Sequence, residues 1–122
     1  MNNIPYGRQW IDEEDISAMA EVLGSDWLTQ GPDIEEFEKA IANYVGAKYV
    51  VTFSSGTSAL HGAMFAAGIE PGDEIITSPI TFVATSNSAI YLGARPRFVD
   101  IDLNTYCIDT SKIEEAITEK TK

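Results

Sequence analysis

Short strand patterns alternate with helical patterns from residue 49 to residue 101, and this alternation limits the folds that the chain can adopt. Residues 49–53 are β-branched and aromatic, as expected of a buried parallel strand, and residues 74–77 and 97–101 are two further predicted strands. Predicted helices over residues 59–67 and about 82–92 separate them, and each ends at a glycine. This alternation predicts an α/β fold with a mostly parallel sheet covered by helices.

Two amphipathic helices are predicted ahead of this region. An acidic turn at residues 12–14 begins the first, which ends at Gly24 and has apolar residues at helical spacing: Ile16, Met19, Ala20 and Leu23. The second begins at Pro32, ends at Gly46 and has one apolar face made of Ile34, Phe37, Ile41 and Tyr44. The segment 25–32 is a predicted loop. We therefore expect a helical arm over residues 1–31 and an α/β domain over residues 32–122.

The end of the sequence indicates that this α/β domain is incomplete. Asp109 or Thr110 can cap a last helix that carries Ile113, and Glu119-Lys120-Thr121-Lys122 follows where another strand would be due. Three parallel strands alone would make a small sheet with an exposed edge. We expect the chain to be the N-terminal part of a longer protein.

Composition excludes several classes of function. The chain has 122 residues, with 8 Lys and Arg against 19 Asp and Glu, and its net charge of −11 argues against nucleic acid as a partner. Cys107 is the only cysteine, so no disulfide and no Cys/His metal site is expected, and a reducing cytoplasm suits the chain. The N-terminus lacks the apolar core of a signal peptide, and every apolar run is too short to cross a membrane.

The motif with the clearest chemistry is Phe53-Ser54-Ser55-Gly56-Thr57-Ser58, which joins a predicted strand to a predicted helix. Backbone N–H groups at such a helix start are free to bind a phosphate, and Thr57 and Ser58 add hydroxyl groups. Gly56 allows a close approach of the backbone. The alternative is a plain helix cap, because capping favours the same residue types.

A second candidate is Phe82, in Thr77-Ser78-Pro79-Ile80-Thr81-Phe82 after the next predicted strand. Ligands of open α/β sheets bind beyond the carboxyl ends of the strands, so Phe82 could stack on a flat ring held near the serine-rich turn. The alternative is an ordinary core phenylalanine.

The remaining polar residues are weaker candidates. Asp100 and Asp102 could form a catalytic carboxylate pair, although a turn at a strand end explains them more simply. His61 lies inside a predicted helix without partners for a catalytic triad. We expect Cys107 to be an inert buried thiol. The acidic residues Glu35, Glu36 and Glu38 are expected on a solvated helix face.

Taken in order, several stretches resemble the DegT/DnrJ/StrS sugar aminotransferases, which are pyridoxal-phosphate (PLP) enzymes of fold type I. The resemblance covers essentially the whole chain and rests on these segments: 27–32, 37–38, 55–60, 68–76, 81–87, 93–102 and 118–122. Tyr6, Leu28-Thr29-Gln30-Gly31 and residues 78–85 most resemble the transaminases of pseudaminic acid biosynthesis. The resemblance implies the N-terminal part of a three-layer α/β/α large domain.

The same resemblance implies roles for individual residues. Gly56, Thr57 and Ser58 would hold the PLP phosphate, and Phe82 would stack on the pyridine ring. The nucleotide-sugar side would be lined by Tyr6, Asp26, Trp27, Leu28, Thr29 and Gly56. The reaction would move an amino group from L-glutamate to C4 of a UDP-linked 4-keto-6-deoxy sugar, in a homodimer that needs neither metal nor membrane.

The resemblance also implies that a key residue lies outside this chain. In the family the Schiff-base lysine comes well beyond the position of Lys122, so these 122 residues are not expected to catalyse the reaction alone. Two alternatives remain open. One is a PLP-dependent sugar dehydratase of the same family, in which a histidine replaces that lysine. The other is a non-enzymatic α/β binding fragment that keeps the phosphate site.

Overall fold

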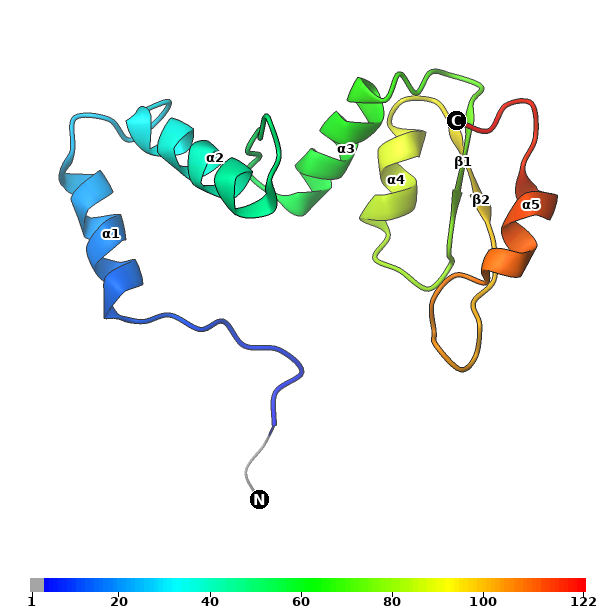
Figure 1. Ribbon diagram of the computed structural model, residues 1–122, viewed down its shortest axis with the longest axis horizontal. Helices are drawn as coiled ribbons and strands as arrows, with labels where there is room; N and C mark the ends of the chain where they lie inside the picture. Colours follow the sequence, from blue (N-terminus) through cyan, green and yellow to red (C-terminus); the bar gives the residue numbers. More distant parts are fainter. Residues whose placement is uncertain (1–3) are drawn as a thin grey trace. The chain divides into compact units, whose positions relative to one another are not determined.

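The computed structural model describes residues 4–122, which form two compact units (Figure 1). The first unit ends at Thr52 and contains α1 (Glu13–Gly24) and α2 (Pro32–Val45). The second unit, from Phe53 to Lys122, contains α3 (Gly56–Ala66), β1 (Glu74–Thr77), α4 (Ala84–Ile90), β2 (Arg95–Phe98), a 3₁₀ turn at Thr110–Lys112 and α5 (Ile113–Ala116). The boundary expected at residue 31 stays a prediction.

Both helices of the first unit begin and end as their sequences predict. The Asp12 carboxylate accepts hydrogen bonds from the N–H groups of Glu14 and Asp15, and the Asp15 carboxylate accepts one from the N–H of Asp12, which completes a capping box. Pro32 starts α2, and Gly46 ends it in the left-handed region at φ 71°. The expected helices over residues 12–24 and 32–46 are therefore confirmed.

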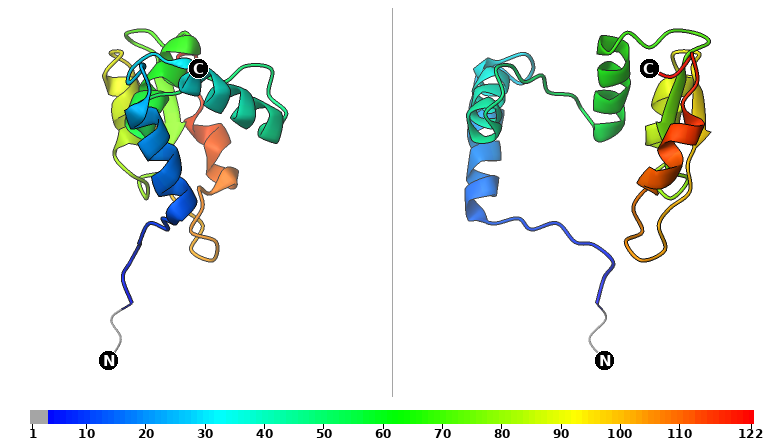
Figure 2. Two further views of the ribbon diagram at one scale, coloured as in Figure 1. Left: turned by 90° about the vertical axis from the view of Figure 1, so that its left-hand side faces the viewer. Right: turned by 45° about the vertical axis from the view of Figure 1, so that its right-hand side comes forward.

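Two parallel strands form the centre of the second unit. β1 pairs with β2 in the register Glu74–Arg95 to Thr77–Phe98, and the right-handed crossover expected between them contains α4. Figure 1 shows the two strands between α4 and α5, and both figures show α3 beside α4 (Figures 1 and 2). The α/β class with a parallel sheet is confirmed.

The core of this unit lies where α4 packs against the sheet. Ala89 of α4 is completely buried, and it meets Ile69, Ile75 and Ala94 in one apolar cluster. Met64 of α3 and Leu92 pack around the edge of that cluster. The small side chain of Ala89 lets α4 lie close to the strands, which sets where the segment before α4 is placed.

The strand expected over residues 49–53 is wrong for the described chain, because these residues form neither helix nor strand. Extended residues become a strand only when a neighbouring strand accepts their backbone hydrogen bonds, and none lies beside them within residues 4–122. A side chain holds the segment instead. The N–H and hydroxyl of Thr52 donate to Glu38 Oε1 of α2 at 2.8 and 2.9 Å.

Two other elements are shifted or shortened relative to their predicted bounds. The strand expected at residues 97–101 runs from Arg95 to Phe98, because the register with β1 is set by the preceding turn, where Arg95 N–H donates to Asp73 O. The helix expected over 82–92 covers only Ala84–Ile90. Asp109 caps the 3₁₀ turn that leads into the last helix, since its carboxylate accepts from the N–H of Ser111, and α5 itself begins at Ile113.

The residues at the end of the chain lie along the other edge of β1. Thr121 forms a parallel bridge with Glu74, in which Glu74 N–H donates to Lys120 O and Lys122 N–H donates to Glu74 O. The Glu74 carboxylate also accepts from the hydroxyl of Thr118 at 2.7 Å. Strand-like pairing therefore begins where the sequence predicts a further strand.

No helix within residues 4–122 has the length and apolar character needed to cross a membrane.

Replacement of Ile75 tests the packing of α4 on the sheet. Ile75→Ala should lower the free energy of unfolding by about 2–4 kcal/mol, because it removes buried methyl groups and leaves a cavity beside Ala89. Urea unfolding followed by circular dichroism measures the loss. The matched control is Ile80→Ala, at a side chain that is 63% exposed, which should change stability by less than about 0.5 kcal/mol. Equal losses would contradict the assigned core.

Candidate functional site

The serine-rich turn expected to bind phosphate forms the start of α3. Ser55 is the N-cap residue, and its hydroxyl oxygen accepts from the N–H of Ser58 at 3.2 Å and pairs with the Ser58 hydroxyl at 3.0 Å. Gly56 and Thr57 are the first two residues of the helix. We call residues 55–58 the phosphate turn. Helix capping and anion binding are both possible in this geometry, because the cap uses only some of the available donors.

The unused donors of the phosphate turn belong to Gly56 and Thr57. Neither backbone N–H has a hydrogen-bond acceptor within residues 4–122, whereas the Ser58 and Ala59 N–H groups donate to Ser55. These two N–H groups carry the positive end of the α3 dipole, which favours an anion by about 0.3–1 kcal/mol at an exposed site. Space is open as well, since a Cβ added to Gly56 would meet no atom within 4 Å.

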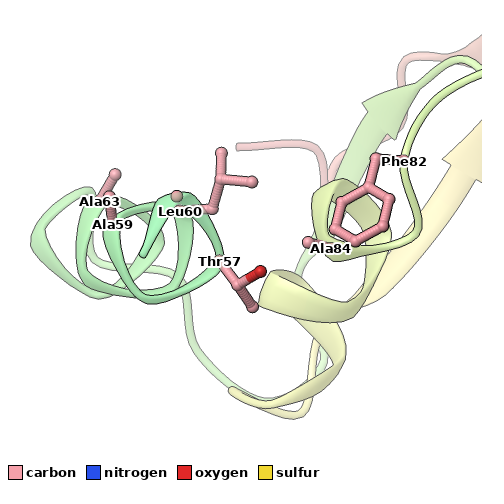
Figure 3. Close-up of a pocket in the computed structure, with 7 residues that line it drawn as sticks. Thr57, Ala59, Leu60, Ala63, Phe82 and Ala84 are labelled. Carbon is pink, nitrogen blue, oxygen red and sulfur yellow. The ribbon is translucent and has the colours of Figure 1, made fainter. Parts of the chain in front are cut away.

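A hollow of about 620 Å³ opens beside the phosphate turn (Figure 3). One wall is α3, and the other is the segment that enters α4. The lining residues are Gly56, Thr57, Ala59, Leu60, Ala63, Phe82 and Ala84. Figure 3 shows Thr57 and Leu60 projecting from α3 toward the side where the Phe82 ring lies. The structure therefore brings three of the four predicted cofactor residues to one hollow, while Ser58 is not among its lining residues and bonds to the cap residue Ser55.

Phe82 is not a core residue. It is 72% exposed, although Ala84, only two residues later, is almost completely buried in the start of α4. The buried anchor at Ala84 and the strand β1 hold the connecting segment at both ends, so the Phe82 ring stands at the edge of the hollow. An exposed aromatic ring in this place is available to stack on a ligand.

Four lining residues were not predicted as site residues. They are Ala59, Leu60, Ala63 and Ala84. The first three share one face of α3 with Gly56, because positions 56, 59, 60 and 63 follow the spacing i, i+3, i+4, i+7. The sequence carried this signal, but an apolar helix face is usually assigned to a core. Only the position of α4 shows that this face borders a hollow.

Asp100 and Asp102 belong to a turn at a strand end, the simpler of the two explanations given for them, and do not form a catalytic pair. Backbone N–H groups of Asn104 and Thr105 donate to Asp102 Oδ1 at 2.7 and 3.0 Å, and these bonds hold the pKa of Asp102 below its ordinary value. Asp100 accepts from the N–H of Ile101. A carboxyl that stays ionised in this way is a poor proton donor, and neither residue lines the hollow.

His61 and Cys107 also lie outside the hollow. The His61 ring packs edge-on against Tyr91, with 5.4 Å between the ring centres. The expectation that Cys107 is buried is wrong, because its side chain is exposed. It lies in the turn that follows Asp102, where Tyr106 adopts a φ of 58° and Ile101 pairs with Ile108 at the base.

The residues expected on the nucleotide-sugar side lie in the first unit, apart from Gly56. Tyr6 is fully exposed, and Trp27 and Leu28 are also largely exposed, with Asp26 and Thr29 in the same loop after α1. Locally, Ser25 ends α1 and orders this loop, because its hydroxyl oxygen accepts from the N–H of Trp27 at 3.2 Å. Their role on the substrate side stays a prediction.

Within the described residues, no three His, Cys, Asp or Glu side chains are grouped so that they could hold a metal ion. None of the five lysines lines the hollow: Lys39, Lys48, Lys112, Lys120 and Lys122.

Comparison with known proteins identifies the family. The model of the DegT/DnrJ/EryC1/StrS aminotransferase family matches residues 9–122. The chain belongs to this family. Its fold, a parallel sheet with helices, is that of PLP-dependent aminotransferases of known structure.

Relatives within the DegT/DnrJ/EryC1/StrS family are longer than this chain. The spore coat polysaccharide biosynthesis protein SpsC of Bacillus subtilis is 50% identical over 119 residues, which are 98% of this chain and 31% of that protein. The UDP-4-amino-4-deoxy-L-arabinose–oxoglutarate aminotransferase of Shewanella sediminis is 46% identical over the same shares. The chain therefore spans about a third of the length of these relatives.

Solved structures of the family agree over nearly the whole chain. The putative sugar aminotransferase Spr1654 of Streptococcus pneumoniae superposes with a TM-score of 0.93 at 36% identity, over 99% of this chain and 31% of that one. It has been solved in a PLP form and in a PMP form, and these structures indicate pyridoxal phosphate as the family's cofactor. A GDP-4-keto-6-deoxymannose-3-dehydratase superposes with a TM-score of 0.90 at 33% identity, over 98% of this chain and 33% of that one.

The capping role of Ser55 can be separated from any ligand. Ser55→Ala should destabilise the start of α3 by about 1 kcal/mol, because the Ser58 N–H loses its acceptor. Faster hydrogen exchange of the Ser58 amide would report the change. The adjacent Ser54→Ala is the control, since the Ser54 side chain makes no hydrogen bond within residues 4–122. Similar exchange in both variants would contradict the assigned cap.

Proposed function

We propose that this chain forms the phosphate-binding and ring-facing part of a PLP-dependent nucleotide-sugar aminotransferase. The enzyme would transfer an amino group from L-glutamate to C4 of a UDP-linked 4-keto-6-deoxy sugar. One observation carries the proposal. The free N–H groups of Gly56 and Thr57 border the same hollow as the exposed ring of Phe82.

The residues around the hollow fit a phosphorylated aromatic cofactor. Two unpaired N–H donors and the Thr57 hydroxyl suit the phosphate, and the apolar side chains of Leu60, Ala63 and Phe82 suit a flat ring. Gly56 leaves the space that a phosphate needs close to the backbone. No charged side chain lines the hollow, so neutral donors and the helix end would provide the attraction for the anion.

When bound, pyridoxal phosphate supplies an aldehyde carbon that takes up the amino group and a ring that stabilises negative charge on carbon. The residues of this chain would position it. Gly56 and Thr57 would hold the phosphate by their N–H groups, Ser58 would support them by its bonds to Ser55, and Phe82 would cover one face of the ring. The resemblance assigns the Schiff-base lysine to sequence beyond Lys122.

The substrate side of the proposal rests on the first unit. By the resemblance, Tyr6 and the loop residues Asp26, Trp27, Leu28 and Thr29 would contact the nucleotide sugar. Exposed aromatic and aliphatic side chains in an ordered loop support this role, because a nucleotide base and a sugar ring both bind against such surfaces.

The choice of sugar rests on two kinds of similarity. The Shewanella relative is named for a 4-amino sugar linked to UDP, which supports amination at C4 of a UDP-sugar. The resemblance of Tyr6, residues 28–31 and residues 78–85 to pseudaminic acid transaminases supports a 6-deoxy-N-acetyl sugar. We further propose a homodimer in the cytoplasm, where sugar nucleotides are available and a lone cysteine stays reduced.

A PLP-dependent sugar dehydratase is the second candidate, because a GDP-4-keto-6-deoxymannose-3-dehydratase shares this fold at 33% identity. The resemblance places the residue that separates the two reactions, a lysine or a histidine, outside these 122 residues. Sequencing of the reading frame beyond codon 122 in the source DNA decides between them: a lysine at the cofactor position supports the aminotransferase, and a histidine supports the dehydratase.

A chimera tests whether this chain can form the phosphate-binding and ring-facing part of a working cofactor site. Residues 1–122 replace the matching 31% of the Shewanella aminotransferase, which is 46% identical over this part. We expect the purified chimera to bind PLP, seen as visible absorbance, and to catalyse the reaction for which that relative is named, measured as glutamate formed from oxoglutarate. A folded chimera without PLP absorbance would overturn the proposal, and the unmodified relative is the control.

Within the chimera, Thr57→Val tests the phosphate contact. Valine keeps the volume and removes the hydroxyl, so PLP affinity should fall roughly tenfold, the value of about 1.4 kcal/mol for one hydrogen bond to a charged group. Fluorescence titration with PLP measures it. Thr110→Val, at an exposed threonine in the 3₁₀ turn and away from the hollow, is the matched control and should leave PLP affinity unchanged. An unchanged affinity in Thr57→Val would contradict the assigned role.

A further inference from the structure

The ring of Phe53 lies directly over Gly62 in the middle of α3. A Cβ added to Gly62 would lie 2.5 Å from Phe53 Cζ and 2.8 Å from Cε1, distances that real Cβ atoms essentially never show. Any side chain at position 62 would therefore push the ring away. Glycine weakens a helix interior, and this close contact gives a physical reason for its presence here.

The contact brackets the phosphate turn. Phe53 comes two residues before the cap Ser55, and Gly62 comes four residues after Ser58 on the helix that the turn begins. The backbone between Phe53 and Gly62 therefore forms a short closed segment that contains every donor of the turn. Residues 49–53 form no strand in the described chain, so side-chain contacts hold the entry to the turn: Thr52 bonds to Glu38, and the next residue, Phe53, packs its ring on Gly62.

We propose that Gly62 is a positioning residue for the phosphate turn and acts through the ring of Phe53. The proposal rests on the proposed function of this turn. A displaced ring carries the Phe53 backbone with it, and the N–H groups of Gly56 and Thr57 then move relative to the Phe82 side of the hollow. Binding sites tolerate displacements of only about 0.5 Å, so the affinity for a phosphate should fall.

Amide chemical shifts of the full 122-residue chain test the positioning directly. Gly62→Ala should shift the amide signals of Gly56, Thr57 and Ser58 and weaken the binding of pyridoxamine 5′-phosphate roughly tenfold. The double variant Phe53→Ala with Gly62→Ala lacks the ring that the new methyl group would meet. Its amide signals and its affinity for pyridoxamine 5′-phosphate should therefore match those of the single variant Phe53→Ala. Gly24→Ala is the matched control, because a Cβ there meets no atom within 4 Å.

The sign of the stability change separates this proposal from a general effect on the helix. Without the ring, Gly62→Ala should stabilise α3, since alanine favours helix more than glycine does. The proposal therefore expects Gly62→Ala to destabilise the chain with Phe53 present and to stabilise it in the Phe53→Ala background. Stabilisation in both backgrounds, or unchanged amide signals in Gly62→Ala, would overturn it. A single variant that fails to fold while the double variant folds would support it, and failure of both to fold would overturn it.

The amide signals also keep the two proposals apart. If the unmodified chain binds no pyridoxamine 5′-phosphate but the turn amides respond to Gly62→Ala as expected, the ligand assigned to the turn is wrong and the positioning role stands. If the chain binds the ligand and Gly62→Ala binds it equally well with unchanged amide signals, the positioning role is wrong and the proposed function stands.

Discussion

The second unit depends on the close packing of α4 against the two-stranded sheet. Ala89 is completely buried against Ile75 and Ala94, and a larger residue there would hold the helix away from the strands. This packing fixes both ends of the segment between β1 and α4, one in the sheet and the other at the buried Ala84. The position of Phe82 follows from it. Because α3 packs on α4, the hollow between the phosphate turn and Phe82 also follows from the same contact.

An anion site in this chain has to work against an overall charge of −11. No lysine or arginine lines the hollow, so long-range attraction does not help a phosphate to bind. Backbone N–H groups and a hydroxyl at the start of α3 provide short-range attraction instead, and such donors depend on geometry more than charges do. This dependence is why the entry of the chain into the turn matters, and why a contact such as that between Phe53 and Gly62 has consequences for binding.

Local patterns predicted most elements because their causes are local. The capping box at Asp12, the proline at the start of α2 and the glycine at its end act within a few residues, and these helices formed as expected. The strand over residues 49–53 has the right composition but needs a partner strand, and no pattern within five residues supplies one. Cys107 was misplaced for a similar reason. Its exposure depends on the turn after Asp102, where Tyr106 adopts a left-handed conformation that is uncommon for tyrosine and is not predicted from its residue type.

The sequence by itself determined the α/β class, the order of the helices and of the two paired strands, and the chemical character of the Ser55-Gly56-Thr57-Ser58 turn, because these depend on periodicity and on residue types in contact along the chain. Only the tertiary structure decided which of two explanations held for Phe82 and for the apolar face of α3. A buried core and an open hollow need the same kinds of side chain, and the difference lies in how far α4 covers that face. That distance is set by Ala89 and its neighbours, which are remote in sequence from the turn.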